Sequence, residues 1–171
     1  MRKIYKLLRF NFFLSFLSYL KYGKLYEYVY KGTKLKIMLD AKIVYGHFAK
    51  MHIGKPEFDD MKAKTTELIL SKGSKLVVEG NVVVESGCLI SLSENTSLEL
   101  LGNLYMMSET KIKVNGKSYI GNGVRFGRGV VIDAKYLKVG DNVYIGSNCK
   151  INGCVEIPSN TTIPTGSVYN L

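Results

Sequence analysis

The stretch VGDNVYIGSNCKINGCVEIPSNTTIPTGSV, residues 139–168, decides the fold, because its large apolar residues return at every sixth position. The members of this series are Val139, Ile145, Ile151, Ile157 and Ile163. A helix buries residues at a period of 3.6 and a single strand at a period of 2, so a strict period of six indicates neither. It indicates a solenoid in which each six-residue step is a short strand followed by a corner.

The residues between these positions suit such corners. Small or β-branched side chains stand four positions after each large one, at Val143, Cys149, Val155, Thr161 and Ser167. Asn or Gly stands three positions after four of the large residues, at Asn142, Asn148, Asn160 and Gly166. Asn and Gly tolerate positive φ better than other residues do, and a tight corner requires it. We therefore expect the large residue of each step to fill the interior and the small one to fit where the interior narrows.

The six-residue register continues upstream with less regularity. Val114, Ile120, Phe126 and Ile132 are spaced by six, but the step from Ile132 to Val139 is seven. Further upstream, one series runs from Leu70 to Cys88 and another from Leu92 to Leu104, and the phase slips between them. We expect an out-pocketing or a skewed coil at that slip. With three faces and about 18 residues per coil, residues 66–171 predict roughly six coils.

The N-terminal segment, residues 1–36, has a different character. It carries nine Lys or Arg against one Glu, and its uncharged run from Phe10 to Leu20 is 11 residues long. That run is too short to span a bilayer as a helix. Apolar residues recur there at three- and four-residue steps, at Leu7, Phe10, Phe13, Leu14 and Leu17. We expect residues 1–36 to form a basic amphipathic helix on an anionic membrane surface, ahead of a solenoid domain over residues 37–171. The alternative is a helix that packs on the solenoid or on a neighbouring subunit.

Composition excludes several classes of protein. The net charge is +10, of which residues 1–64 carry +9 and residues 65–171 carry +1. No RNA-binding motif accompanies the lysines and tyrosines of residues 19–36, so no nucleic-acid partner is expected. The three cysteines have no metal-ligand spacing and are expected to be reduced thiols of a cytoplasmic protein. Two histidines are too few for a three-histidine zinc site, and no metal is expected.

Residues 139–168 resemble the hexapeptide-repeat acyltransferases. RFNFFLSFLSYLKYGK, residues 9–24, and KIVYGHFAKMHIGK, residues 42–55, are similar to the opening segment of the bacterial O-acetyltransferases of capsule and lipopolysaccharide biosynthesis. The resemblance implies a left-handed parallel β-helix and a homotrimer. It also implies acetyl-CoA as co-substrate between subunits and transfer of its acetyl group to a saccharide hydroxyl. Such a protein would be cytoplasmic or peripheral at the inner face of the membrane.

The family uses a histidine as general base on the acceptor hydroxyl, because imidazole titrates near pH 7. Here Asp133 matches the family pattern, but Leu137 stands where the histidine is expected and the loop that normally follows is missing. The remaining candidates for the catalytic base are His47 and His52. The pattern around both is more typical of an ordinary coil-surface or turn histidine than of a displaced catalytic base.

We expect the coenzyme groove at the last coils. Gly146 and Ser147 would present backbone amides to the thioester carbonyl, and Gly166 and Ser167 would allow close approach of the pantetheine arm. Lys150 would meet a phosphate. The alternative for both glycines is that they form corners.

Three functions remain open at this point. The chain is an active O-acetyltransferase, or a catalytically degenerate member that serves as a scaffold or partner subunit, or a membrane-peripheral module that binds sugar.

Overall fold

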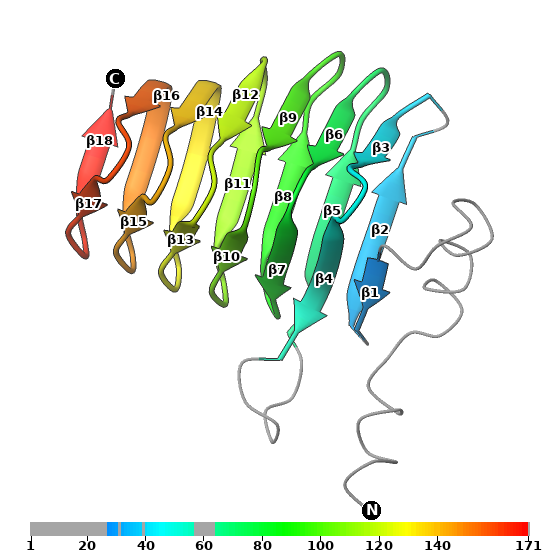
Figure 1. The fold of residues 1–171 in the computed structure, drawn as a ribbon, viewed down its shortest axis with the longest axis horizontal. Coiled ribbons are helices and arrows are strands. Elements are labelled where there is room, and N and C mark those ends of the chain that lie inside the picture. The colour runs from blue at the N-terminus through cyan, green and yellow to red at the C-terminus, as the bar shows by residue number, and fades with distance from the viewer. Residues whose placement is uncertain (1–26, 31, 39, 57–63, 171) are drawn as a thin grey trace, which may run out of the picture.

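The structure, a computed structural model, describes residues 27–30, 32–38, 40–56 and 64–170. Those residues form eighteen strands and no helix. Neighbouring strands pair in parallel, and the chain winds into a β-solenoid of about six coils (Figure 1). The all-β solenoid predicted from the six-residue period is confirmed.

Three faces, which we call A, B and C, enclose the interior. Face A contains β2 (Thr33–Ile37), β5 (Thr66–Leu70), β8 (Leu89–Leu92), β11 (Lys111–Val114) and β18 (Val168–Asn170). Face B contains β3 (Lys42–Tyr45), β6 (Lys75–Val78), β9 (Ser97–Leu100) and β12 (Ser118–Ile120). The long strands β14 (Val131–Val139) and β16 (Lys150–Ile157) bend from face A to face B. Face C contains β1 (Glu27–Val29), β4 (Lys50–Lys55), β7 (Asn81–Glu85), β10 (Leu104–Met106), β13 (Val124–Phe126), β15 (Tyr144–Ile145) and β17 (Thr162–Ile163).

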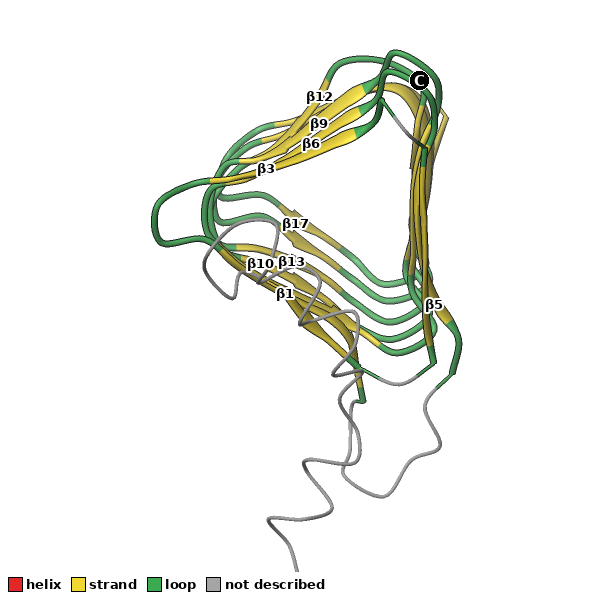
Figure 2. Cartoon of the chain, turned by 90° about the vertical axis from the view of Figure 1, so that its right-hand side faces the viewer, coloured by secondary structure: helices red, strands yellow, loops and turns green. Residues whose placement is uncertain are grey.

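The solenoid is left-handed. Figure 2 looks along it from the N-terminal end, with face A on the right, face B at upper left and face C at lower left. The chain passes from β2 to β3, then to β4, and returns to face A at β5. This path is counterclockwise while the coils recede from the viewer, which defines a left-handed helix. The handedness implied by the family resemblance is therefore confirmed.

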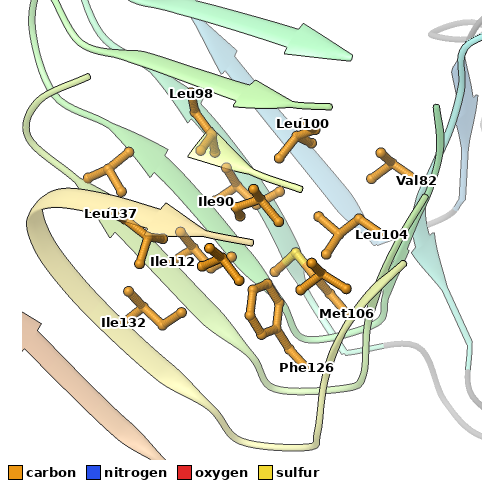
Figure 3. Close-up of a cluster of buried hydrophobic side chains, with 14 of the residues drawn as sticks. Val82, Ile90, Leu98, Leu100, Leu104, Met106, Ile112, Phe126, Ile132 and Leu137 are labelled. Carbon is orange, nitrogen blue, oxygen red and sulfur yellow. The ribbon is translucent and has the colours of Figure 1, made fainter. Parts of the chain in front are cut away.

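The interior is filled by side chains that alternate inward along each short strand. Figure 3 labels ten of them, which come from all three faces and meet in the centre of the middle coils. Phe126 and Met106 are fully buried and are among the largest side chains of this core. Equivalent inward residues stack coil on coil. On face A, for example, Leu68 aligns with Ile90, Ile112, Ile132 and Ile151.

From β8 onward the coils shorten toward the C-terminus, and the A–B corner accounts for the change. The inward step from face A to face B is ten residues from Ile90 to Leu100, eight from Ile112 to Ile120, seven from Ile132 to Val139 and six from Ile151 to Ile157. Early coils cross this corner by a separate turn, residues 93–96, whereas β14 crosses it with a bulge between Ala134 and Tyr136. The expected out-pocketing between Cys88 and Leu92 is wrong, because both residues are buried and the additional residues lie at the A–B corner.

The helix predicted over residues 1–36 is wrong where the structure describes that segment. Glu27–Val29 and Thr33–Ile37 are the strands β1 and β2, paired with β4 and β5. This segment forms strands because inward and outward side chains alternate along it. Val29 is fully buried, whereas Tyr28 and Tyr30 on either side of it are half-buried. The rest of the predicted helix, residues 1–26, lies outside the described residues.

A ladder of polar side chains runs up the B–C corner. Each side chain accepts a hydrogen bond from a backbone amide of the preceding coil. Asn122 Oδ1 accepts from Asn103 N at 2.8 Å, Asp141 Oδ1 accepts from Asn122 N at 2.7 Å, and Ser159 Oγ accepts from Asp141 N at 2.9 Å. Amides that would otherwise be unpaired at the corner are satisfied in this way.

The C–A corner repeats one left-handed backbone position in five successive coils, at Gly87, Glu109, Gly129, Asn148 and Gly166, with φ between 58° and 79°. Glu109, at φ 68°, is the only one of the five with a long side chain. A residue other than Gly or Asn is strained in this left-handed backbone conformation. We expect Glu109→Gly to raise Tm by about 3 °C. Thermal unfolding followed by circular dichroism measures this.

Glu109→Ala is the matched control, because it removes the exposed ion pair with Lys64 but keeps a Cβ at the strained position. An exposed pair contributes little to stability, so Tm should barely change. Equal stabilisation by both substitutions would show that loss of the ion pair, rather than relief of strain, is responsible.

Candidate functional site

The outer side of face C carries a row of aromatic and basic side chains. Successive strands align Tyr28, His52, Val83, Tyr105, Arg125, Tyr144 and Thr162. These residues point outward because their strand neighbours, such as Met51 and Ile53 on β4, are buried in the core. The row contains one of the two histidines predicted as candidate bases.

His52 is held firmly at the N-terminal end of this row. Its ring stacks on that of Tyr28, with 4.5 Å between centroids and an interplanar angle of 5°, and lies 6.5 Å from the ring of Tyr30. Burial lowers the pKa of His52 below its ordinary value, and the positive charges of Lys55 and Lys50 lower it further. The imidazole is therefore neutral at pH 7 and able to accept a proton.

His47 has a different environment. It lies in the loop between β3 and β4, where its ring meets Phe48 edge-on at 4.6 Å. The side chain of Phe48 is 86% exposed, so this pair lies at the surface rather than in a pocket. Of the two candidate histidines, only His52 lies on a strand with packed neighbours.

A buried carboxylate, which the sequence reasoning missed, supports the same row. Glu85 ends β7 and is only 2% exposed. Its carboxylate accepts hydrogen bonds from the Tyr105 hydroxyl and, at 2.8 Å each, from the Ser108 backbone amide and hydroxyl. A carboxylate accepts and does not donate, so three convergent donors suit it. Glu85 thereby fixes Tyr105, two strands along face C from His52.

The five residues predicted to bind the coenzyme come together at the C–A corner of the last two coils. Gly166 N donates to Ser147 O at 2.9 Å, and Lys150 N donates to Ser167 O at 2.9 Å. Gly146 N donates to Ile163 O at 2.8 Å, so this amide belongs to the ladder between coils. A Cβ at Gly146 would lie 2.5 Å from Thr165 N. The close approach of the next coil leaves no room for a side chain at position 146. The positive φ at position 166 favours glycine there.

The two predicted groups lie far apart within one chain. His52 is on β4, and residues 146–150 follow β15, four strands further along face C. At about 4.8 Å per strand, the separation along the solenoid is roughly 19 Å. The structure therefore brings the coenzyme candidates together but does not bring them to His52.

Face B ends in a shallow groove of about 460 Å³ at the B–C corner, lined by residues that include Tyr119, Tyr136, Lys138 and Asp141. Its lysine is paired with Glu156. The sequence pattern gave no signal for it, because the lining residues lie on successive coils and are scattered along the chain.

Among the residues that the structure describes, no three His, Cys, Asp or Glu side chains gather as a metal site would. Within the same residues, no helix has the length and apolar character needed to cross a membrane. Burial raises the pKa of the Cys88 thiol to about 12, so this cysteine is not a nucleophile at neutral pH.

The chain matches no protein-family model, no curated protein and no solved structure.

Proposed function

We propose that this chain is an acetyl-CoA-dependent O-acetyltransferase that acts on a bacterial surface polysaccharide or its lipid-linked precursor, with His52 as general base. The observation that carries the proposal is the position of His52 on the outer side of face C, where its ring stacks on Tyr28 and burial lowers its pKa. The left-handed solenoid and the sequence resemblance of residues 139–168 support the reaction class, although a fold alone does not establish an activity.

The chemistry assigned to His52 is removal of a proton from a saccharide hydroxyl. As the proton moves to the imidazole, the hydroxyl oxygen attacks the thioester carbonyl of acetyl-CoA. The carbon–sulfur bond then breaks, and the departing thiolate takes the proton back from the imidazolium. A base that is neutral at the working pH suits both halves of this transfer.

The coenzyme has to bridge the distance between the two groups of residues. We propose that it lies along the C–A edge, with its phosphates near Lys150 and the C-terminal corner and its thioester directed toward His52. The pantetheine arm would span their separation along the solenoid, which is roughly 19 Å. In a homotrimer, which the resemblance implies, a neighbouring subunit would form the other side of the groove at this edge.

Calorimetric titration with acetyl-CoA tests the proposal directly. We expect micromolar binding, about −8 kcal/mol, together with release of free thiol when a saccharide acceptor is added. The variant Lys150→Ala should bind more weakly, because a phosphate loses its cation. Absence of binding at millimolar acetyl-CoA would exclude the proposed acetyltransferase activity.

One observation favours a second function, that of a non-catalytic scaffold or partner subunit. Leu137, at the position where the resemblance expects the histidine, is fully buried in the core, and its amide donates to Ser118 Oγ at 3.1 Å. This position is therefore structural in the present chain. If the scaffold function is correct, the protein will co-purify with an active acetyltransferase and will show no transfer of its own.

A further inference from the structure

The N-terminal end of the solenoid exposes apolar side chains. In the first coil, Ile37 is 42% exposed, Met38 56%, Val44 40% and Phe48 86%. Ile37 lies on β2, the first strand of face A among the described residues, so no described strand covers it from the N-terminal side. Large exposed apolar groups gathered in one coil mark a contact surface.

Phe48 is presented outward by its loop. The B–C corner of the first coil, residues 46–49, is wider than its successors and protrudes beyond them at the left of Figure 2. Gly46 N donates to Val78 O at 2.8 Å, and Ala49 N donates to Gly46 O at 3.2 Å. These bonds hold a tight turn with Phe48 at its tip.

Lysines surround the apolar groups of the first coil. Five are exposed, at Lys34, Lys36, Lys42, Lys50 and Lys55. Asp40 is the one acidic residue between positions 28 and 56. The opposite end of the solenoid also exposes apolar side chains, Val168 at 61% and Tyr169 at 39%, but residues 157–170 carry no charged side chain.

We propose that the N-terminal end of the solenoid docks onto an anionic membrane surface. In this arrangement Phe48 and Met38 enter the interfacial region, and the lysines contact acidic headgroups. Apolar insertion combined with basic residues is the combination that holds a protein at such an interface. A second copy of the same end is a poor occupant, because the two rings of lysines would repel each other.

The proposal concerns the folded first coil and does not depend on acetyl transfer. It also differs from attachment through residues 1–26 alone, and the experiments separate the two. The chain contains no tryptophan. Phe48→Trp therefore introduces a single fluorescent reporter at the tip of the loop, and Val168→Trp introduces one at the opposite end.

With vesicles of phosphatidylcholine and phosphatidylglycerol, we expect a blue shift of Phe48→Trp emission and its quenching by brominated lipid. Val168→Trp should show neither change. Vesicles of phosphatidylcholine alone should produce no shift, and added salt should reverse the effect, because headgroup attraction is screened. No shift in Phe48→Trp while the protein still binds the vesicles would overturn the proposal and assign binding to residues 1–26.

Vesicle co-sedimentation of the full chain gives the second test. We expect the double variant Met38→Ser/Phe48→Ser to bind about tenfold more weakly or worse, because two inserted apolar side chains are lost. The matched control Leu101→Ser/Val168→Ser removes exposed apolar groups away from the first coil and should bind like the wild type. Equal binding of both variants would contradict the assignment of the contact to the first coil.

Discussion

Replacing His52 with glutamine is expected to lower kcat for acetyl transfer by about 10²–10⁴-fold, the usual contribution of a general base. Glutamine keeps much of the side-chain volume and can still pack against Tyr28, so KM should change little. The effect is measured by thiol release at saturating acetyl-CoA and acceptor.

The pH profile gives a second readout of the same role. Burial and the two lysines lower the pKa of His52, so the imidazole loses its proton below pH 6.5, the ordinary value. The wild-type rate should therefore rise with pH through a value below 6.5 and be level at pH 7. In His52→Gln this acid limb should disappear.

His47→Gln is the matched control, because His47 is the other histidine of the chain and sits on the exposed loop beside Phe48. It should retain the wild-type rate. Equal loss in both variants would indicate damage to the first coil, and unchanged activity in His52→Gln would assign the base to another group.

The sequence predicts the fold best where the repeat is shortest. From Val139 onward the inward residues follow the six-residue period, and their places on the faces are as expected. Upstream the period fails, since the A–B corner takes a separate four-residue turn such as residues 93–96. A turn on the outside of a solenoid changes the spacing of the core residues without changing their packing, so periodicity alone cannot locate it.

The candidate site was less predictable, for a related reason. His52 was a candidate only because the chain has two histidines. Its stacking on Tyr28 depends on β1 pairing with β4 across 24 residues, in a segment predicted as helix. Glu85 gave no signal, because a Glu after Val82, Val83 and Val84 resembles a surface charge that ends an apolar run. Its partners Tyr105 and Ser108 belong to the next coil.

The candidate base and the proposed membrane contact belong to the same coil, the first. Lys50 and Lys55 flank His52 on β4 and also belong to the lysines around Phe48. If the first coil rests on a membrane, then His52 lies next to the surface where a lipid-linked saccharide would present its hydroxyl groups. Such a placement would explain why the basic residues and the candidate base share one coil, while the C-terminal coils are nearly neutral.

Removing the carboxylate of Glu85 is expected to destabilise the protein by about 3 kcal/mol, the largest effect on stability that we predict. In Glu85→Ala the amide and hydroxyl of Ser108 and the hydroxyl of Tyr105 each lose the hydrogen bond that they donate to the Glu85 carboxylate. Each hydrogen bond that is lost costs about 1 kcal/mol, and the two to Ser108 are buried. Urea unfolding followed by circular dichroism measures the change.

Glu85→Gln separates charge from shape. The amide oxygen can accept from one side, but the NH₂ group then faces a donor on the other, so we expect an intermediate loss of about 1–2 kcal/mol. Combining it with Ser108→Ala removes a competing donor and should recover part of that loss, which a double-mutant cycle detects. Glu94→Gln, at an exposed turn, is the control and should stay within about 0.5 kcal/mol of wild type. If Glu85→Ala were as stable as this control, the three hydrogen bonds would be incidental, and the buried carboxylate would require a functional rather than a structural explanation.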